Sequence, residues 1–167
     1  MDFSISILLI TYNIIFAWDD LKKTAEENLE DARRDLTERI SVYKIFKGCE
    51  IILVFDAYKV KGNRGEVEKF GGITIVYTKE SQTADAYIEK AAKELTKNYN
   101  VTVATSDSME QLIIFGSGAY RMTAKQLQQE VGEVEKGVRK FVEQYNIEPE
   151  NSDFMKTLRE KLREIED

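Results

Sequence analysis

Histidine is absent from the 167-residue chain, and cysteine and proline occur once each, as Cys49 and Pro149. Without histidine, the chain can build neither a Ser-His-Asp or Cys-His catalytic centre nor a histidine-ligated metal site. A single cysteine also excludes an intramolecular disulfide and a cysteine-cluster zinc site. Any chemistry must therefore use carboxylates, hydroxyls, lysines or a bound metal ion.

Basic residues are outnumbered by acidic ones, 24 to 30, which gives a formal net charge of -6 and a pI near 5.0. This balance argues against a basic coat for nucleic acid over the whole surface, but it leaves room for a local basic face. The length is typical of one domain, and a hydrophobic content of 43% is enough for a sizeable core.

The apolar stretch from Ile5 to Ile15 is the only candidate for a targeting or membrane segment near the N-terminus. It is interrupted by polar residues and is shorter than the ~20 apolar residues that span a bilayer. It also lacks the leading basic region of a signal peptide. We therefore expect an interior strand, no membrane association and a cytoplasmic location.

Four short runs rich in Ile, Val and Leu predict strands that are covered on both faces. They are Ile5–Ile10, Ile51–Phe55, Ile73–Tyr77 and Val101–Ala104. Helical patterns lie between them, and such alternation predicts an α/β fold: a three-layer sandwich with a mostly parallel central sheet.

The helical patterns fall in four places. One long helix is expected from Asp19, its N-cap, to about Phe46, a second from Thr83 to about Lys97, and a third from near Asp107. The chain after Arg121 reads as wholly helical until Pro149 breaks it. The glycine-rich segment Ala57–Gly72 shows no convincing period, so it is either a functional loop or a plain crossover.

The domain organisation follows from these patterns. We expect one domain over residues 1–145. The remaining residues, 146–167, carry an apolar stripe at helical spacing and predict a C-terminal helical extension packed on the same domain. Gly132 and Gly137 lie inside the helix expected after Arg121 and weaken it, so close packing around these two glycines is considered as well.

Three aspartates follow or lie near predicted strand ends: Asp56, Asp85 and Asp107. The carboxyl ends of parallel strands form the crevice in which open α/β sheets bind ligands. Clustered carboxylates repel one another unless a cation joins them, and Mg²⁺ prefers such hard oxygen ligands. The alternative is that Asp85 and Asp107 only cap helices. For the three together, a metal site that activates water is favoured by a small margin.

Two neighbouring segments add polar groups to this edge. Ser106 lies beside Asp107 and could hold a metal-bound phosphate, although serine is also an ordinary turn residue. The segment Gly116–Arg121 could bring backbone amides and the Arg121 guanidinium near a phosphate. A turn between helices explains its glycines equally well.

Several short motifs together resemble the YacP-like branch of the NYN domains, which are relatives of the PIN nucleases. They are Tyr12-Asn13-Ile14-Ile15, Ala17-Trp18, Val54-Phe55-Asp56-Ala57, Val60-Lys61-Gly62, Tyr77-Thr78-Lys79-Glu80, Thr83-Ala84-Asp85, Ala104-Thr105-Ser106-Asp107, Glu110-Gln111 and Gly116-Ser117-Gly118-Ala119, in that order. The resemblance extends from Ile7 to about Val138.

This resemblance implies a PIN-like α/β sandwich and a metal-dependent endoribonuclease that uses Mg²⁺ or Mn²⁺. In the best-known branch of the family the substrate is messenger RNA on the ribosome. Carried over by position, the resemblance implies a catalytic metal cleft and a set of RNA contacts. The cleft comprises Asp56, Asp85 and Asp107, and the RNA contacts are Asn13, Lys61, Arg64, Ser106 and Arg121.

One departure from the family pattern concerns the end of the first strand. The family typically reads Asp-Gly-Tyr-Asn there, whereas this chain has no aspartate and carries the neutral Thr11 before Tyr12-Asn13. Losing one carboxylate should weaken binding of the metal ion. The departure therefore leaves two readings open, an impaired endoribonuclease and a non-catalytic RNA- or ribosome-binding module. A receiver-like or nucleotide-binding domain is disfavoured because no glycine-rich phosphate loop follows the first strand.

Overall fold

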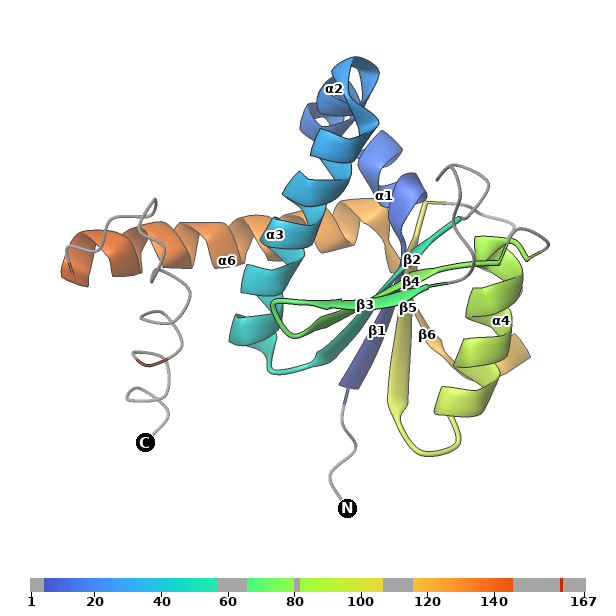
Figure 1. Cartoon of the computed structure of the whole chain (residues 1–167). Helices are drawn as coiled ribbons and strands as arrows, with labels where there is room; N and C mark the ends of the chain where they lie inside the picture. The colour runs from blue at the N-terminus through green and yellow to red at the C-terminus, as the bar shows by residue number, and fades with distance from the viewer. Residues whose placement is uncertain (1–4, 57–65, 80–81, 107–115, 146–159, 161–167) are drawn as a thin grey trace.

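The computed structural model describes residues 5–56, 66–79, 82–106, 116–145 and 160. At its centre is a six-stranded sheet with the strand order β3-β4-β2-β1-β5-β6 (Figure 1). The strands are β1 Ile5–Ile10, β2 Glu50–Phe55, β3 Val67–Phe70, β4 Ile73–Tyr77, β5 Asn100–Thr105 and β6 Tyr120–Thr123. All neighbours pair in parallel except β3 and β4, which are antiparallel.

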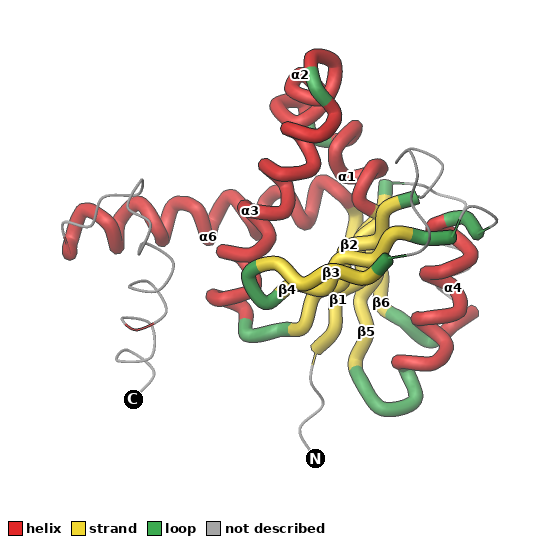
Figure 2. Tube along the Cα trace, viewed as in Figure 1, coloured by secondary structure: helices red, strands yellow, loops and turns green. Residues whose placement is uncertain are grey.

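Helices cover both faces of this sheet. They are α1 Thr11–Ala17, α2 Asp19–Glu27, α3 Leu29–Lys47, α4 Ala84–Leu95 and α6 Ala124–Tyr145. The helix α4 lies on one face, and α1, α3 and α6 pack on the other, while α2 projects away from the sheet (Figure 2). The predicted α/β three-layer sandwich with a mostly parallel sheet is therefore confirmed.

The central strand β1 shows why the apolar runs are nearly continuous. Residues Ile7–Ile10 are each at most 4% exposed. Ile7 and Leu9 belong to the core under α3 and α6, whereas Leu8 and Ile10 belong to the core under α4. Because successive side chains of a strand point to opposite faces, a strand covered on both sides must be apolar at every position.

The predicted single helix from Asp19 to Phe46 is wrong. The chain leaves helical conformation at Asn28, whose φ is -156°, and resumes as α3. The Asn28 side chain accepts hydrogen bonds from the backbone N–H groups of Glu30 and Asp31, so a strong N-cap interrupts the apolar stripe. Asp19 is also not an N-cap: Trp18 holds that position before α2, and Asp19 is the first helical residue.

Three short elements were not expected from the sequence. The apolar stretch after Ile10 turns into the helix α1 instead of continuing as a strand. Part of the glycine-rich segment forms β3, which returns to β4 through Gly71 and Gly72, both with positive φ. The edge strand β6 precedes α6, so the chain after Arg121 is not wholly helical. Each element is too short for a periodic pattern to stand out.

Two sequence expectations fall outside the described residues. They are the helix beginning near Asp107 and the C-terminal extension over residues 146–167, whose packing on the domain stays a prediction. Among the described helices, none combines the length and apolar character required to cross a membrane.

Candidate functional site

Four of the residues predicted from the sequence lie around the carboxyl-terminal edge of the sheet. Asp56 directly follows β2 and Ser106 directly follows β5, while Asn13 lies in α1, which begins where β1 ends. Asp85 is in the first turn of α4, after β4. Parallel strands bring all these positions to one edge, the usual ligand-binding edge of an open α/β sheet.

The strand order places Asp56 and Ser106 on opposite sides of the central strand β1. The central strand β1 pairs with β2, where Ile10 is opposite Val54, and with β5, where Leu9 is opposite Ala104. The first turn of α4 reaches the same edge, because Ala84 shares an apolar cluster with Ile10 and Val54. The carboxylates of Asp56 and Asp85 are therefore borne by adjacent parts of one edge.

Asp85 does not cap α4. The N-cap is Thr83, whose Oγ1 accepts a hydrogen bond from the backbone N–H of Ala86 at 3.1 Å. Asp85 is exposed in the first turn, where a negative charge is favoured by the helix dipole. The capping role considered for Asp85 is thus already filled by a neighbouring side chain.

Hydrogen bonds made by Asn13 and Ser106 join α1 to the end of β5. The Asn13 side-chain amide donates to Thr105 Oγ1 at 3.2 Å, and Ser106 Oγ donates to the backbone carbonyl of Asn13 at 3.4 Å. These bonds connect α1 to the end of β5 across more than 90 residues of sequence. Both side chains therefore help fix the geometry of the edge, in addition to the RNA contacts predicted for them.

The end of the first strand carries no carboxylate. Compared with the Asp-Gly-Tyr-Asn motif of the resemblance, the chain after Ile10 has one residue fewer before Tyr12-Asn13, and the neutral Thr11 stands in place of the aspartate. Ile10 is 4% exposed and belongs to the apolar cluster under α4. Thr11 is fully buried, and its Oγ1 makes no hydrogen bond within the described part of the chain. This position offers an apolar side chain and an unused hydroxyl where the family has an anion.

The donor set is chemically suited to one hard cation. Mg²⁺ is usually held by one or two carboxylates together with water and substrate oxygens, and Asp56 and Asp85 supply carboxylates at this edge. Within the described ranges, however, no three acidic, histidine or cysteine side chains come together as a metal site. The third predicted ligand, Asp107, lies outside the described residues.

Arg121 lies apart from these acids. It is exposed on β6, the outermost strand, opposite Val103 of β5. Three strand spacings separate β6 from β2, a distance of roughly 14 Å across the sheet. Arg121 lines a cavity of about 340 Å³ with residues of α6. The structure therefore does not bring Arg121 beside Asp56. Lys61 and Arg64 lie outside the described residues.

An aromatic column stands beside Asp56 and was not predicted from the sequence. The rings of Tyr12 and Phe55 meet edge to face at 5.5 Å, and those of Phe55 and Tyr77 stack at 5.4 Å. The Arg33 guanidinium of α3 lies 6.0 Å from the Phe55 ring and donates to the Tyr12 hydroxyl at 3.3 Å.

The electrostatics of Tyr12 connect this column to the acidic edge. Burial raises the pKa of Tyr12, the positive charge of Arg33 opposes that rise, and the charge of Asp56 adds to it. Arg33 could not be singled out by sequence reasoning, because α3 bears charged residues all along its polar side and a solvated arginine gives the same pattern.

Comparison with known proteins agrees with this picture. The chain is 38% identical over 144 residues to "Uncharacterized protein YacP" of Bacillus subtilis, covering 85% of this chain and 84% of that protein. Two solved structures of Rae1 (YacP) from Bacillus subtilis superimpose with TM-scores of 0.74. One is a tryptophan-to-leucine mutant, 32% identical, covering 96% of this chain and 99% of that one; the other is 35% identical, covering 99% and 93%.

The family model for the YacP-like NYN domain matches residues 7–167, nearly the whole chain. That match includes the strand-end aspartates, the aromatic column and the α1 segment. The chain therefore belongs to the YacP-like NYN domain family.

Proposed function

We propose that the protein is an endoribonuclease that depends on Mg²⁺ or Mn²⁺ and cleaves RNA, including messenger RNA on the ribosome. Membership of the NYN family supports a nuclease-like, RNA-related function, and nucleases of the wider NYN/PIN-like group are generally metal-dependent. The observation that supports the proposal is that Asp56, after β2, and Asp85, in the first turn of α4, both lie at the carboxyl-terminal edge of the sheet.

Each residue has a distinct role in this proposal. Asp56, Asp85 and Asp107 hold the metal ion, which when bound polarises water and stabilises negative charge on a phosphodiester. Asn13 and Ser106 keep α1 and the end of β5 in place and contact the RNA. Lys61, Arg64 and Arg121 attract its backbone, with Arg121 acting farther along the strand because β6 is the outer strand.

Cleavage is expected to be slow because the first strand ends in Ile10 and Thr11. An apolar side chain cannot ligate a cation, and the Thr11 hydroxyl is a much weaker ligand than a carboxylate. The acidic edge therefore has one negative charge fewer than the family motif provides. A cytoplasmic location fits this proposal, since the cytoplasm contains both the RNA and free magnesium.

A cleavage assay with a labelled single-stranded RNA in Mn²⁺ tests the proposal. We expect slow cleavage by the unaltered chain, loss of cleavage in Asp85→Asn, and a gain of at least about tenfold when Thr11 is replaced by Asp-Gly, since a carboxylate is the ligand Mg²⁺ and Mn²⁺ favour. Asp19→Asn is the matched control, because Asp19 is an exposed acid in the first turn of α2, a helix that projects away from the sheet. Cleavage that persists at full rate in Asp85→Asn would contradict the assigned metal site.

The second candidate function is an RNA- or ribosome-binding module that no longer cleaves. The observation in its favour is the neutral, fully buried Thr11 at the end of the first strand, where the family motif has an aspartate. This candidate predicts RNA binding that weakens with salt, is unchanged by EDTA and is accompanied by no cleavage with any metal ion. Cleavage in Mn²⁺ that requires Asp85 would exclude it.

A further inference from the structure

Arg33 is the arginine of α3 that faces the carboxyl-terminal edge of the sheet. Its side chain is partly buried, its Nη1 donates to the Tyr12 hydroxyl at 3.3 Å, and its guanidinium lies over the Phe55 ring. Tyr12 comes from the start of α1 and Phe55 is the last residue of β2. Two residues of the functional edge therefore fix the position of this guanidinium.

No carboxylate neutralises Arg33 within the described residues. The ion pairs of that part of the chain include Arg34 with Asp31 at 2.7 Å and Arg39 with both Asp20 and Glu135, but none with Arg33. A partly desolvated charge without a counter-ion is unfavourable, so such a group needs another reason to be held in place.

A cavity of about 180 Å³ lies in front of Arg33. Besides Arg33, its walls include Glu30, Arg34, Phe55, Phe70 and Tyr77. Glu30 is the charge of opposite sign in this wall, and it forms no ion pair with Arg33. The cavity thus offers a free guanidinium beside aromatic rings, at the strand end that carries Asp56.

We propose that Arg33 binds a backbone phosphate of the RNA, and that Tyr12 and Phe55 orient its guanidinium for this contact. The proposal rests on the proposed RNA-cleaving function and adds a binding residue that motif matching did not identify. A guanidinium presents a planar fork of N–H donors that matches a phosphate, and Arg33 uses one donor on a neutral hydroxyl. The RNA would then run from the acidic edge toward the cavity in front of Arg33.

The experiment compares Arg33→Gln with Arg39→Gln. Both variants remove one positive charge from α3, but Arg39 is not part of the cavity wall and is already paired with Asp20 and Glu135. A fluorescein-labelled single-stranded RNA is titrated with each full-length variant in EDTA, over a series of salt concentrations. We expect Arg33→Gln to weaken binding about tenfold and to reduce the slope of log affinity against log salt by about 0.7, the value for one phosphate contact on a single strand. Arg39→Gln should leave both quantities unchanged.

A second variant separates binding from folding. Arg33→Lys keeps the charge but loses the fork, so it should restore the salt slope while recovering only part of the affinity. Equal effects of the Arg33 and Arg39 variants, with RNA still bound and cut by the unaltered chain, would overturn this proposal and leave the proposed function intact. Absence of both binding and cleavage in the unaltered chain would overturn the two together.

Discussion

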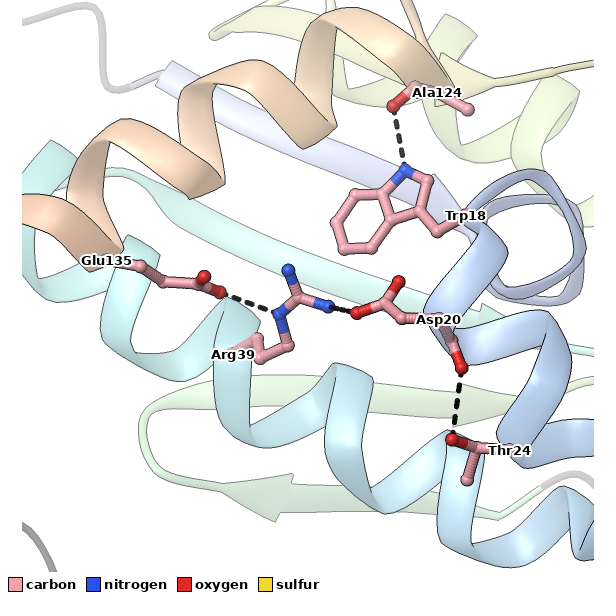
Figure 3. Close-up of polar contacts among 6 residues, drawn as sticks. All are labelled: Trp18, Asp20, Thr24, Arg39, Ala124 and Glu135. Carbon is pink, nitrogen blue, oxygen red and sulfur yellow. Dashed lines mark hydrogen bonds and ion pairs between the residues drawn. The ribbon is translucent and has the colours of Figure 1, made fainter.

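Two arginines of α3, Arg33 and Arg39, stand over aromatic rings in very different surroundings. Arg39 lies 4.9 Å from the Trp18 ring, and its Nε and Nη1 bind Glu135 at 2.7 Å and Asp20 at 2.9 Å (Figure 3). Arg33 lies 6.0 Å from Phe55 and has only the Tyr12 hydroxyl as a hydrogen-bond partner in the described part of the chain.

The difference indicates that the two arginines have separate roles, although both belong to α3. The partners of Arg39 come from α2 and α6, so its guanidinium joins α3 to these two helices. The partners of Arg33 come from the functional edge, and its charge remains available there. Arg39 therefore belongs to the part that stabilises the domain, and Arg33 to the part that meets a ligand. The predictions below test this contrast.

The largest effect is expected from Trp18→Ala on the Arg39 side. Trp18 is fully buried, and its Nε1 donates to the backbone carbonyl of Ala124 at 2.8 Å (Figure 3). Replacing a buried tryptophan with alanine leaves a large cavity and typically costs about 3–5 kcal/mol. Urea denaturation should show this loss in the free energy of unfolding. A loss below about 1 kcal/mol would mean that the Trp18 site collapses or is not a structural anchor.

The next effect is a loss of stability at alkaline pH, to which the buried tyrosines Tyr43 and Tyr12 contribute. Tyr43 donates to Glu130 at 2.7 Å, and burial, reinforced by the Glu130 charge, raises its pKa far above the usual value of 10. The folded state then keeps a proton that the unfolded state releases above pH 10. The contribution of Tyr43 to stability is therefore complete below pH 10 and falls as pH rises, by about 1.4 kcal/mol at pH 11.

Tyr43 and Tyr12 should contribute unequally to this loss of stability at alkaline pH. For Tyr12 the rise in pKa caused by burial is opposed by Arg33. Denaturation curves measured between pH 8 and pH 11 give the free energy of unfolding as a function of pH. This dependence on pH should become flatter in Tyr43→Phe than in Tyr12→Phe. If the Tyr12 variant flattened the profile more, the assigned electrostatic difference between the two sides would be wrong.

A smaller effect compares the two arginines directly. Arg39→Gln removes a cation–π contact and two partly exposed ion pairs, which together are worth about 1 kcal/mol. Arg33→Gln should cost about 0.5 kcal/mol or less, because its ring contact is longer and no ion pair is lost. High salt should shrink the Arg39 loss and leave the Arg33 value nearly unchanged. For RNA binding the order is reversed: Arg33→Gln should weaken the affinity for RNA, and Arg39→Gln should not.

Most strands of the sheet could be predicted because each one is recognised from a few consecutive apolar residues. The apolar runs of β1, β2, β4 and β5 are found within a residue of their observed ends, since strands covered on both faces need continuous apolar residues. The missed strands β3 and β6 have four residues each and lie at the edges, where exposure removes that pattern.

The candidate site was predictable only in part. Asp56 and Asp85 were found because position after a strand is visible in sequence. Arg33 was not, because its importance depends on Tyr12 and Phe55, which are 21 and 22 residues away along the chain and make contact only after folding. The break at Asn28 was missed for a related reason, because one capping side chain outweighs the helical periodicity on both sides.

The smallest effect concerns α6, the helix that supplies Glu135 to Arg39. A Cβ built on Gly132 or Gly137 meets no atom within 4 Å, so the close packing considered at these glycines does not occur among the described residues. Gly132→Ala and Gly137→Ala should each raise the free energy of unfolding by about 0.5–1 kcal/mol, because alanine loses less backbone entropy in a helix. RNA binding should not change.

Gly118→Ala provides the matched control for these substitutions. A Cβ on Gly118 also meets open space, but its φ of +83° is strained for any residue with a side chain, so this variant should lose stability. Thermal denaturation of the three variants therefore separates helix propensity from backbone strain. A destabilising Gly132→Ala would mean that another part of the chain closes on this face of α6, and residues 146–167 are the segment whose apolar stripe could do so.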